Sequence, residues 1–192
     1  GWHKLPVTPG PAARSGHVMA HDPQTGLLLL AFGQSQSQVF DDTWLLHTDS
    51  LRWQKVGGPS PGARRQAALT ATQQGLVLFG GQTQSGQYLG DTWSFDGAGW
   101  KAGPSSLCES KPLLPGTLPR CRVGATLVES PEDHSALLIG GLLASSSDNA
   151  ATSDDTGWRF SDGNWSMAPF RVPPFVLGRF AHGAALVRQN SQ

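Results

Sequence analysis

The chain lacks an excess of charge of either sign, since 14 basic residues balance 14 acidic ones among its 192 residues. A protein without net charge has no field that would attract nucleic acid or an anionic membrane. The chain also lacks any apolar run near the ~20 residues that a membrane-spanning helix needs. We therefore expect no nucleic-acid partner and no membrane insertion by this segment.

Residue types that carry catalysis or bind metals are scarce as well. Tyr88 is the only tyrosine, and Cys108 and Cys121 are the only cysteines. The sequence contains no phosphate-binding loop and no zinc-type spacing of cysteines and histidines. It therefore predicts a protein that is not an enzyme and that uses no cofactor and no metal.

What the chain does have is glycine, proline and repetition. Its 24 glycines and 14 prolines fit many short strands joined by turns. Three landmarks recur with a period near 50 residues: an arginine, an apolar run that ends in glycine, and two spaced tryptophans. Six of the seven tryptophans fall into such pairs, which chance does not readily explain. The repeats start at Arg14, Arg64 and Arg122, and their tryptophan pairs are Trp44 with Trp53, Trp93 with Trp100, and Trp158 with Trp165.

Each repeat predicts four short strands. The first follows the arginine, and the second is the apolar run, which is too short for a buried helix. The third carries an Asp-Thr-Trp sequence, and the fourth begins at the second tryptophan. Aspartate and glycine hairpin signals separate the last two strands. Four antiparallel strands in a period near 50 are typical of a propeller blade, so the sequence predicts an all-β fold.

These repeats resemble kelch repeats of the galactose-oxidase-like β-propeller superfamily over nearly the whole chain. The matching marks are Gly80-Gly81, Gly140-Gly141, the Asp-Thr-Trp sequences and the second tryptophans. Two departures stand out. The first repeat has Gly33-Gln34 in place of a glycine pair, and the third reads Asp155-Thr156-Gly157-Trp158, with an inserted glycine.

The resemblance implies a kelch-type partial arc of three four-stranded antiparallel blades, with one flanking strand at each end. Similar propellers close six or seven blades into a ring. We therefore expect this chain to be a piece of a larger propeller, or to be completed by another chain. The expected units are a last strand at 1–5, blades at 14–57, 64–103 and 122–168, and a first strand at 179–188.

One face of such a propeller is expected to bind a partner. In this strand order, the loop between the second and third strands emerges on the same face as the connection between blades, and loops on a rigid scaffold carry binding residues. Tyr88 lies in one of these loops. The expected loop pairs are Gln34 to Asp41 with Gly57 to Ala63, Gln82 to Gly90 with Gly103 to Arg120, and Leu142 to Asp154 with Pro169 to Gly178.

The repeat arginines start the innermost strands on this face and are candidate partner-binding residues. They are Arg14, Arg64, Arg122 and Arg179. Some kelch proteins hold acidic peptides with arginines near such places, and a planar guanidinium suits a carboxylate bidentately. The alternative is that the arginines bind backbone carbonyls, or pair with Asp42, Asp91 and Asp155 within the fold.

Two further features bear on the setting of the chain. A bond between Cys108 and Cys121, which are 13 residues apart, would close a short loop. Two unrelated thiols or a metal-binding pair are the alternatives. Asn164-Trp165-Ser166 fits the glycosylation sequon on a hairpin turn. Together with the low lysine content, these features favour an extracellular or secretory-lumen setting over a cytoplasmic one.

The sequence thus predicts a protein-interaction module, a scaffold or adaptor whose partner is another protein. The copper chemistry of galactose-oxidase-like sites needs converging tyrosines, which Tyr88 alone does not supply. A sugar-binding or sialic-acid-isomerising propeller is the alternative, since the segment from Ser153 to Gly157 is partly similar to the S-x-D-x-G box of sialidase propellers. A purely structural ectodomain is the third possibility.

Overall fold

The computed structural model describes residues 1–3, 9–22, 25–106, 108, 118–143, 152–153 and 156–171. Every regular element in these ranges is a β-strand. Since these ranges hold no helix, they hold none that is long and apolar enough to cross a membrane. The expected strand at 179–188 lies outside the described residues.

Three four-stranded antiparallel sheets follow one another along the chain, each with its strands in sequence order. The first sheet contains β1 (Val18–His21), β2 (Leu28–Ala31), β3 (Thr43–His47) and β4 (Arg52–Lys55). The second contains β5 (Ala68–Thr72), β6 (Gly75–Gln82), β7 (Tyr88–Phe95) and β8 (Trp100–Ser105). The third contains β10 (Thr126–Glu129), β11 (Ala136–Ile139), β14 (Thr156–Ser161) and β15 (Asn164–Arg171). The predicted all-β, blade-type architecture is confirmed.

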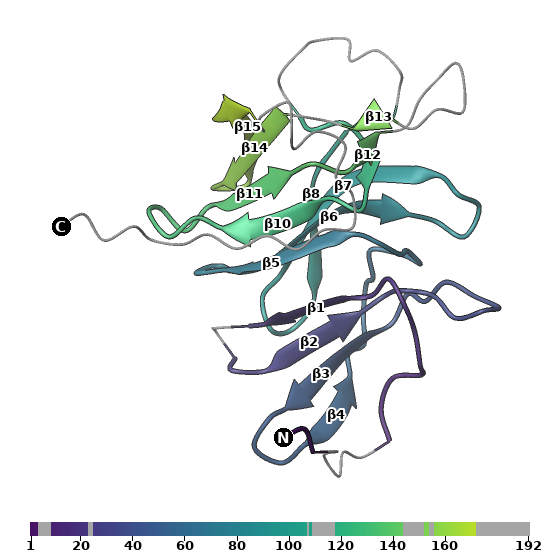
Figure 1. Ribbon diagram of the computed structural model, residues 1–192. Coiled ribbons are helices and arrows are strands. Elements are labelled where there is room, and N and C mark those ends of the chain that lie inside the picture. The colour runs from purple at the N-terminus through teal and green to yellow at the C-terminus, as the bar shows by residue number, and fades with distance from the viewer. Residues whose placement is uncertain are drawn as a thin grey trace.

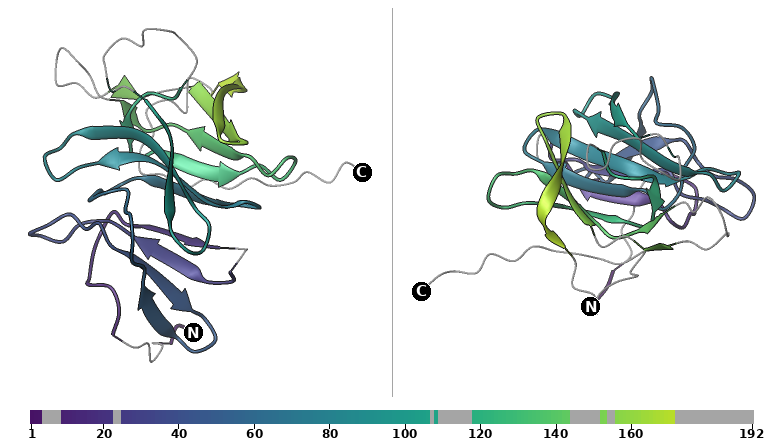
Figure 2. Two further views of the ribbon diagram at one scale, coloured as in Figure 1. Left: turned by 180° about the vertical axis from the view of Figure 1, so that it is seen from behind. Right: turned by 90° about the horizontal axis from the view of Figure 1, so that it is seen from above.

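A small three-stranded sheet extends the third blade at one end. It has the order β13 (Thr152–Ser153), β12 (Leu142–Leu143) and β9 (Arg122–Val123). The three large sheets stack as an arc, with the first blade at the bottom of Figure 1 and the third at the top. The rear view on the left of Figure 2 shows the same succession of sheets.

The first strands of the three blades lie next to one another near the middle of the arc (Figure 1). A short chain of backbone hydrogen bonds joins the turns that precede them. The Gln66 N–H donates to the Gly16 carbonyl at 2.7 Å, and the Gly124 N–H donates to the Gln66 carbonyl at 2.9 Å. All three residues have positive φ, at 61°, 53° and 65°. The blades are therefore linked at equivalent backbone positions.

The core lies between the sheets rather than within any one of them. One buried cluster joins the first and second blades around Phe32, Leu76 and Trp100. A second cluster joins the second and third blades around Phe79, Leu138 and Trp165. The strand β6 is covered on both faces, which is why it reads as a continuous apolar run rather than an alternating one.

The second tryptophan of a repeat belongs to the junction with the preceding blade. The Trp100 indole N–H donates to the Thr43 hydroxyl at 2.9 Å, and the Trp165 indole N–H donates to the Thr92 hydroxyl at 2.8 Å. Both indoles are buried, and each packs near a phenylalanine of the preceding blade, with ring centroids 5.2–5.7 Å apart. The threonine of Asp-Thr-Trp therefore accepts the hydrogen bond that the second tryptophan of the next blade donates across the junction.

The first tryptophan of a repeat shows how the third repeat aligns with the others. The Trp44 and Trp93 indoles donate to the carboxylates two residues earlier, Asp42 and Asp91, at 2.8 and 2.6 Å. The Trp158 indole donates instead to the Thr156 hydroxyl at 3.0 Å. The inserted glycine thus moves Thr156 into the aspartate position, and Gly157 takes the place of the threonine that receives a neighbouring indole.

The first repeat replaces a different glycine from the one expected. Phe32 has φ 62°, like Gly80 at 66° and Gly140 at 69°, and Gly33 has φ 88°, like Gly81 at 102° and Gly141 at 93°. The counterpart of the glycine pair is therefore Phe32-Gly33, not Gly33-Gln34. A bulky residue rarely adopts this conformation. Phe32 is fully buried against Trp100, and this packing offsets the backbone cost.

The contact between Thr92 and Trp165 predicts a measurable contribution to stability. A Thr92→Val substitution keeps the shape of the side chain but leaves the buried indole N–H of Trp165 without its acceptor. We expect the free energy of unfolding in urea to fall by about 1–3 kcal/mol. The control is Thr70→Val in β5, where the half-buried hydroxyl receives no indole. Equal stabilities of the two variants would contradict the role of Thr92.

Candidate interaction face

One side of the arc carries the β2–β3 and β6–β7 connections and the segments leading into β5 and β9. We call this side the loop face. The two loops project toward the right of Figure 1. They touch across the first junction, since the Val39 N–H donates to the Gln84 side-chain oxygen at 2.7 Å. Most of the third expected loop pair, Leu142 to Asp154 with Pro169 to Gly178, lies outside the described residues.

Arg64 is buried beneath this face, with 1% of its side chain exposed. Its guanidinium makes a bidentate pair with Asp91, with two N–O distances of 2.8 Å. It also donates to the backbone carbonyls of Pro61, Gly62 and Gly80. These contacts satisfy the hydrogen-bonding capacity of the guanidinium inside the fold.

Arg14 and Arg122 repeat this arrangement. Arg14 pairs with Asp42 through N–O distances of 2.5 and 3.0 Å and donates to the Phe32 carbonyl at 2.9 Å. Arg122, which is 1% exposed, donates to the Gly140 carbonyl at 2.9 Å. In each repeat the arginine thus reaches the carbonyl of the first residue of the glycine-pair position. Arg179 and Asp155 lie outside the described residues.

The two aspartates are held in their charged form by these pairs. Burial alone raises the pKa of Asp91, but the hydrogen bonds and charge of Arg64 and the Trp93 indole outweigh it, so the pKa lies below the ordinary value of 3.8. Asp42 shows the same balance, since burial is outweighed by Arg14 and Trp44 and the pKa is again lowered. This geometry fits the alternative of pairing within the fold. Partner binding by the repeat arginines stays a prediction.

Arg65 is the residue on this face that the sequence reasoning missed. It is half-buried, and its guanidinium donates to the Gln82 side-chain oxygen at 2.8 and 3.1 Å and to the Gln34 side-chain oxygen. No carboxylate among the described residues pairs with it. The available signal was a second arginine directly after the repeat arginine, where the other repeats have Ser15 and Val123.

Tyr88 and the two cysteines meet at the other end of the face. Tyr88 is half-buried at the start of β7, and its carbonyl oxygen lies 3.3 Å from the Cys108 sulfur. Cys108 and Cys121 form a disulfide, with their Cα atoms 5.3 Å apart. A Cβ added at Gly90 would lie 2.5 Å from the Cys121 sulfur. The disulfide can therefore pack against β7 only because residue 90 has no side chain.

Two further predictions concern glycosylation at Asn164 and metal binding. Asn164 is exposed at the start of β15, and its side-chain amide donates to the Asp162 carbonyl at 3.0 Å. Its glycosylation stays a prediction. Within the described ranges, no group of three or more histidine, cysteine or acidic residues could hold a metal ion.

The buried pair of Arg64 and Asp91 predicts a pH-dependent stability. The folded-state pKa of Asp91 is lowered, so its contribution is complete above about pH 4 and is lost as the pH falls through the folded-state value. An Asp91→Asn variant should lose about 3–5 kcal/mol at pH 7, because it leaves a buried cation without its counter-ion. Its urea unfolding curve should also depend less on pH below 4. Asp41→Asn, at an exposed carboxylate of the first repeat, is the control, and a similar loss there would refute the assignment.

The disulfide predicts a second stability effect. Replacing both Cys108 and Cys121 by serine should lower the free energy of unfolding by roughly 3 kcal/mol, because the unfolded chain regains the freedom of the closed loop. Thermal unfolding with and without reductant measures this effect. Two reactive thiols in the denatured, unreduced wild-type protein would show that no bond forms.

Comparison with known proteins gives a consistent result. A family model described as the KLHDC2/KLHL20/DRC7 Kelch-repeats domain matches residues 1–192. An F-box/kelch-repeat protein of Arabidopsis thaliana is 27% identical over 177 residues, which are 85% of this chain and 35% of that protein. Adagio-like protein 3 of Oryza sativa subsp. japonica is 29% identical over 155 residues, 76% of this chain and 22% of the relative. Adagio protein 3 of Arabidopsis thaliana is 32% identical over 114 residues, 55% of this chain and 18% of the relative. The chain thus spans about a third or less of these relatives.

Proposed function

Because the chain belongs to the kelch-repeat family described as the KLHDC2/KLHL20/DRC7 Kelch-repeats domain, we propose that it is a protein-interaction module that binds its partner through the loop face. The predicted kelch resemblance is confirmed by this membership. Kelch-repeat domains, as in F-box/kelch and Adagio proteins, are typically interaction modules without catalytic activity. The identity of the partner, and the residues that bind it, are part of the proposal.

The observation that carries the proposal is the setting of Arg65. Neutral amide oxygens of Gln34 and Gln82 hold its guanidinium in place, and no carboxylate of the described residues neutralises it. The Gln82 amide is itself fixed, since its N–H donates to the Gly86 carbonyl at 2.9 Å. A held cation loses little rotational freedom when a carboxylate binds, and a charge-assisted hydrogen bond is stronger than a neutral one.

The surface beside Arg65 suits an extended polar peptide. A shallow depression on the loop face is lined by 13–15 and 34–37, a segment rich in serine and glutamine side chains. These groups can donate to and accept from a peptide backbone. We therefore propose an acidic peptide segment of another protein as the ligand, with one carboxylate bound by Arg65.

A peptide selection tests this proposal. Peptides selected from a random library on the purified protein should be enriched in aspartate and glutamate. Arg65→Gln should weaken the selected peptides by about tenfold or more, because the charge-assisted bond is lost. Affinity should also fall as salt is raised. Arg65→Lys should keep the charge and retain part of the affinity.

Folding and binding are separated by matched variants. Arg65→Gln should lower the melting temperature far less than Arg64→Gln, because Arg65 bonds only to neutral amides whereas Arg64→Gln breaks the buried pair with Asp91. Lys101→Gln, at an exposed cation of β8 away from the loops, should change neither property. Selected peptides that lack acidic residues, or that bind Arg65→Gln as well as wild type, would refute the acidic ligand.

Several predictions about binding residues and domain organisation stay predictions. They concern the blade boundaries, the additional blades that would complete a ring, and binding through Arg14, Arg64, Arg122, Arg179 or Tyr88. A structural role without a partner is the competing possibility, and it predicts that the selection recovers no specific peptide.

A further inference from the structure

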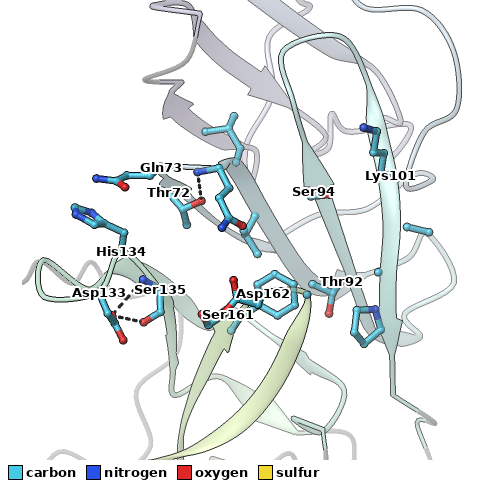
Figure 3. Close-up of a pocket in the computed structure, with 18 residues that line it drawn as sticks. Thr72, Gln73, Thr92, Ser94, Lys101, Asp133, His134, Ser135, Ser161 and Asp162 are labelled. Carbon is cyan, nitrogen blue, oxygen red and sulfur yellow. Dashed lines mark hydrogen bonds between the residues drawn. The ribbon is translucent and has the colours of Figure 1, made fainter.

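A second hollow lies between the second and third blades, at the opposite ends of their strands from the loop face. Three turns surround it: 72–74 between β5 and β6, 133–135 between β10 and β11, and 161–163 between β14 and β15. Side chains of β7 and β8, among them Ser94 and Lys101, line the rest (Figure 3). Its volume is about 550 Å³, in the range of small-molecule sites.

This junction cleft is open where the corresponding part of the first junction is closed. The strand registers pair Phe95 with Trp100 and Phe160 with Trp165, so Gly97 in one turn corresponds to Asp162 in the other. Gly97 sits so close to the first blade that an added Cβ would lie 2.5 Å from the Thr25 methyl group. Asp162 cannot approach the second blade in the same way, because it carries a side chain. Asp162 is exposed, and a Cβ added at the next residue, Gly163, would meet no atom within 4 Å.

The charges around the cleft are largely used within the protein. The Lys101 ammonium lies 2.7 Å from an Asp96 carboxylate oxygen, and it lowers the pKa of that carboxyl to about 2 together with the backbone N–H groups of Ala98 and Gly99. Asp133 pairs with Arg159. The cleft therefore presents neither a strong positive site for an anion nor a cluster of carboxylates for a cation.

The polar groups of the cleft that lie outside these ion pairs are neutral donors and acceptors and one carboxylate. Within the described part of the chain, the Ser94 hydroxyl and the Gln74 side-chain amide make no hydrogen bond. The Asp162 carboxylate accepts one from the Ser161 hydroxyl at 3.0 Å and keeps free lone pairs. Figure 3 shows Ser94 on β7 and Asp162 in the β14–β15 turn, and both residues line the same hollow. Such spaced groups suit a ligand that carries several hydroxyls.

The cleft also has an apolar side. Phe160 lines it and is half-buried, with its ring centroid 5.0 Å from that of Trp165. Pro104 on β8 adds a second apolar surface. A sugar ring presents apolar C–H groups on its faces and hydroxyls around its edge, so it can use an aromatic side chain and neutral polar groups at once. Charged cofactors and purely apolar molecules use only part of this lining.

We propose that the junction cleft is a binding site for a neutral carbohydrate of one or two sugar rings. Asp162 accepts hydrogen bonds from ligand hydroxyls, Ser94 supplies a hydroxyl, and Phe160 packs against the face of a ring. The site is separate from the loop face, so ligand and peptide can be bound at the same time. The proposal does not depend on the function proposed above.

Titration of the purified full chain with lactose, maltose and diacetylchitobiose tests the site. At least one of these sugars should bind by calorimetry with an affinity in the millimolar range or tighter, as is usual for a small ligand with few contacts. Asp162→Asn should weaken it by about tenfold, because the charged acceptor is lost. The positive φ of Asp162, 50°, is well tolerated by asparagine, so the turn is kept. Ser94→Phe should abolish binding by filling the hollow.

Two matched variants locate the site. Asp49→Asn, in the corresponding turn of the first blade, and Arg65→Gln, on the loop face, should leave sugar binding unchanged. Failure of all three sugars to bind the wild-type protein would overturn the proposal. A sugar that binds wild type and Asp162→Asn equally well would also overturn it, and this result would stand even if Ser94→Phe did not fold.

Discussion

The buried guanidinium at the start of each repeat is the constraint on which the rest of the blade depends. A charge removed from water has to be paired and fully hydrogen-bonded, or it destabilises the fold. Arg64 meets this requirement with the Asp91 carboxylate, the Gly80 carbonyl and two carbonyls of the segment that leads into β5. One side chain therefore fixes the end of the second strand, the start of the third and the incoming connection. These are also the segments from which the loop face is built, so the geometry of that face follows from a buried ion pair.

The junctions between blades rest on a different contact, in which a large indole crosses to the neighbouring sheet and donates to a threonine. Because Trp100 and Trp165 each bury their rings beside a phenylalanine of the preceding blade, no blade completes its core alone. Stability in such an array is shared between the repeats and their interfaces. Gly157 removes the acceptor from the third blade, so a further sheet packed there would need another partner for its indole.

Much of this could be read from the sequence, because repetition multiplies weak signals. The tryptophan pairs, the apolar runs and the arginine with its possible aspartate partner all follow from comparing three copies. Features that belong to a single copy were harder to find. Phe32 at positive φ violates a local preference that only its packing against Trp100 explains. Arg65 resembles a duplicate of its neighbour until Gln34 and Gln82 are placed beside it. The cleft at Asp162 depends on a comparison of two turns in three dimensions, which spacing along the chain does not provide.

The disulfide between Cys108 and Cys121 has a consequence for the integrity of the chain. The two residues bracket the connection from the second blade to the third, and both ends are tied to β7 through Tyr88 and Gly90. Proteolytic cleavage anywhere between the cysteines would therefore cut the polypeptide without releasing a fragment. The nicked protein would migrate as one species until it is reduced. The two blades would keep their alignment through the covalent bridge and the packing at Trp165.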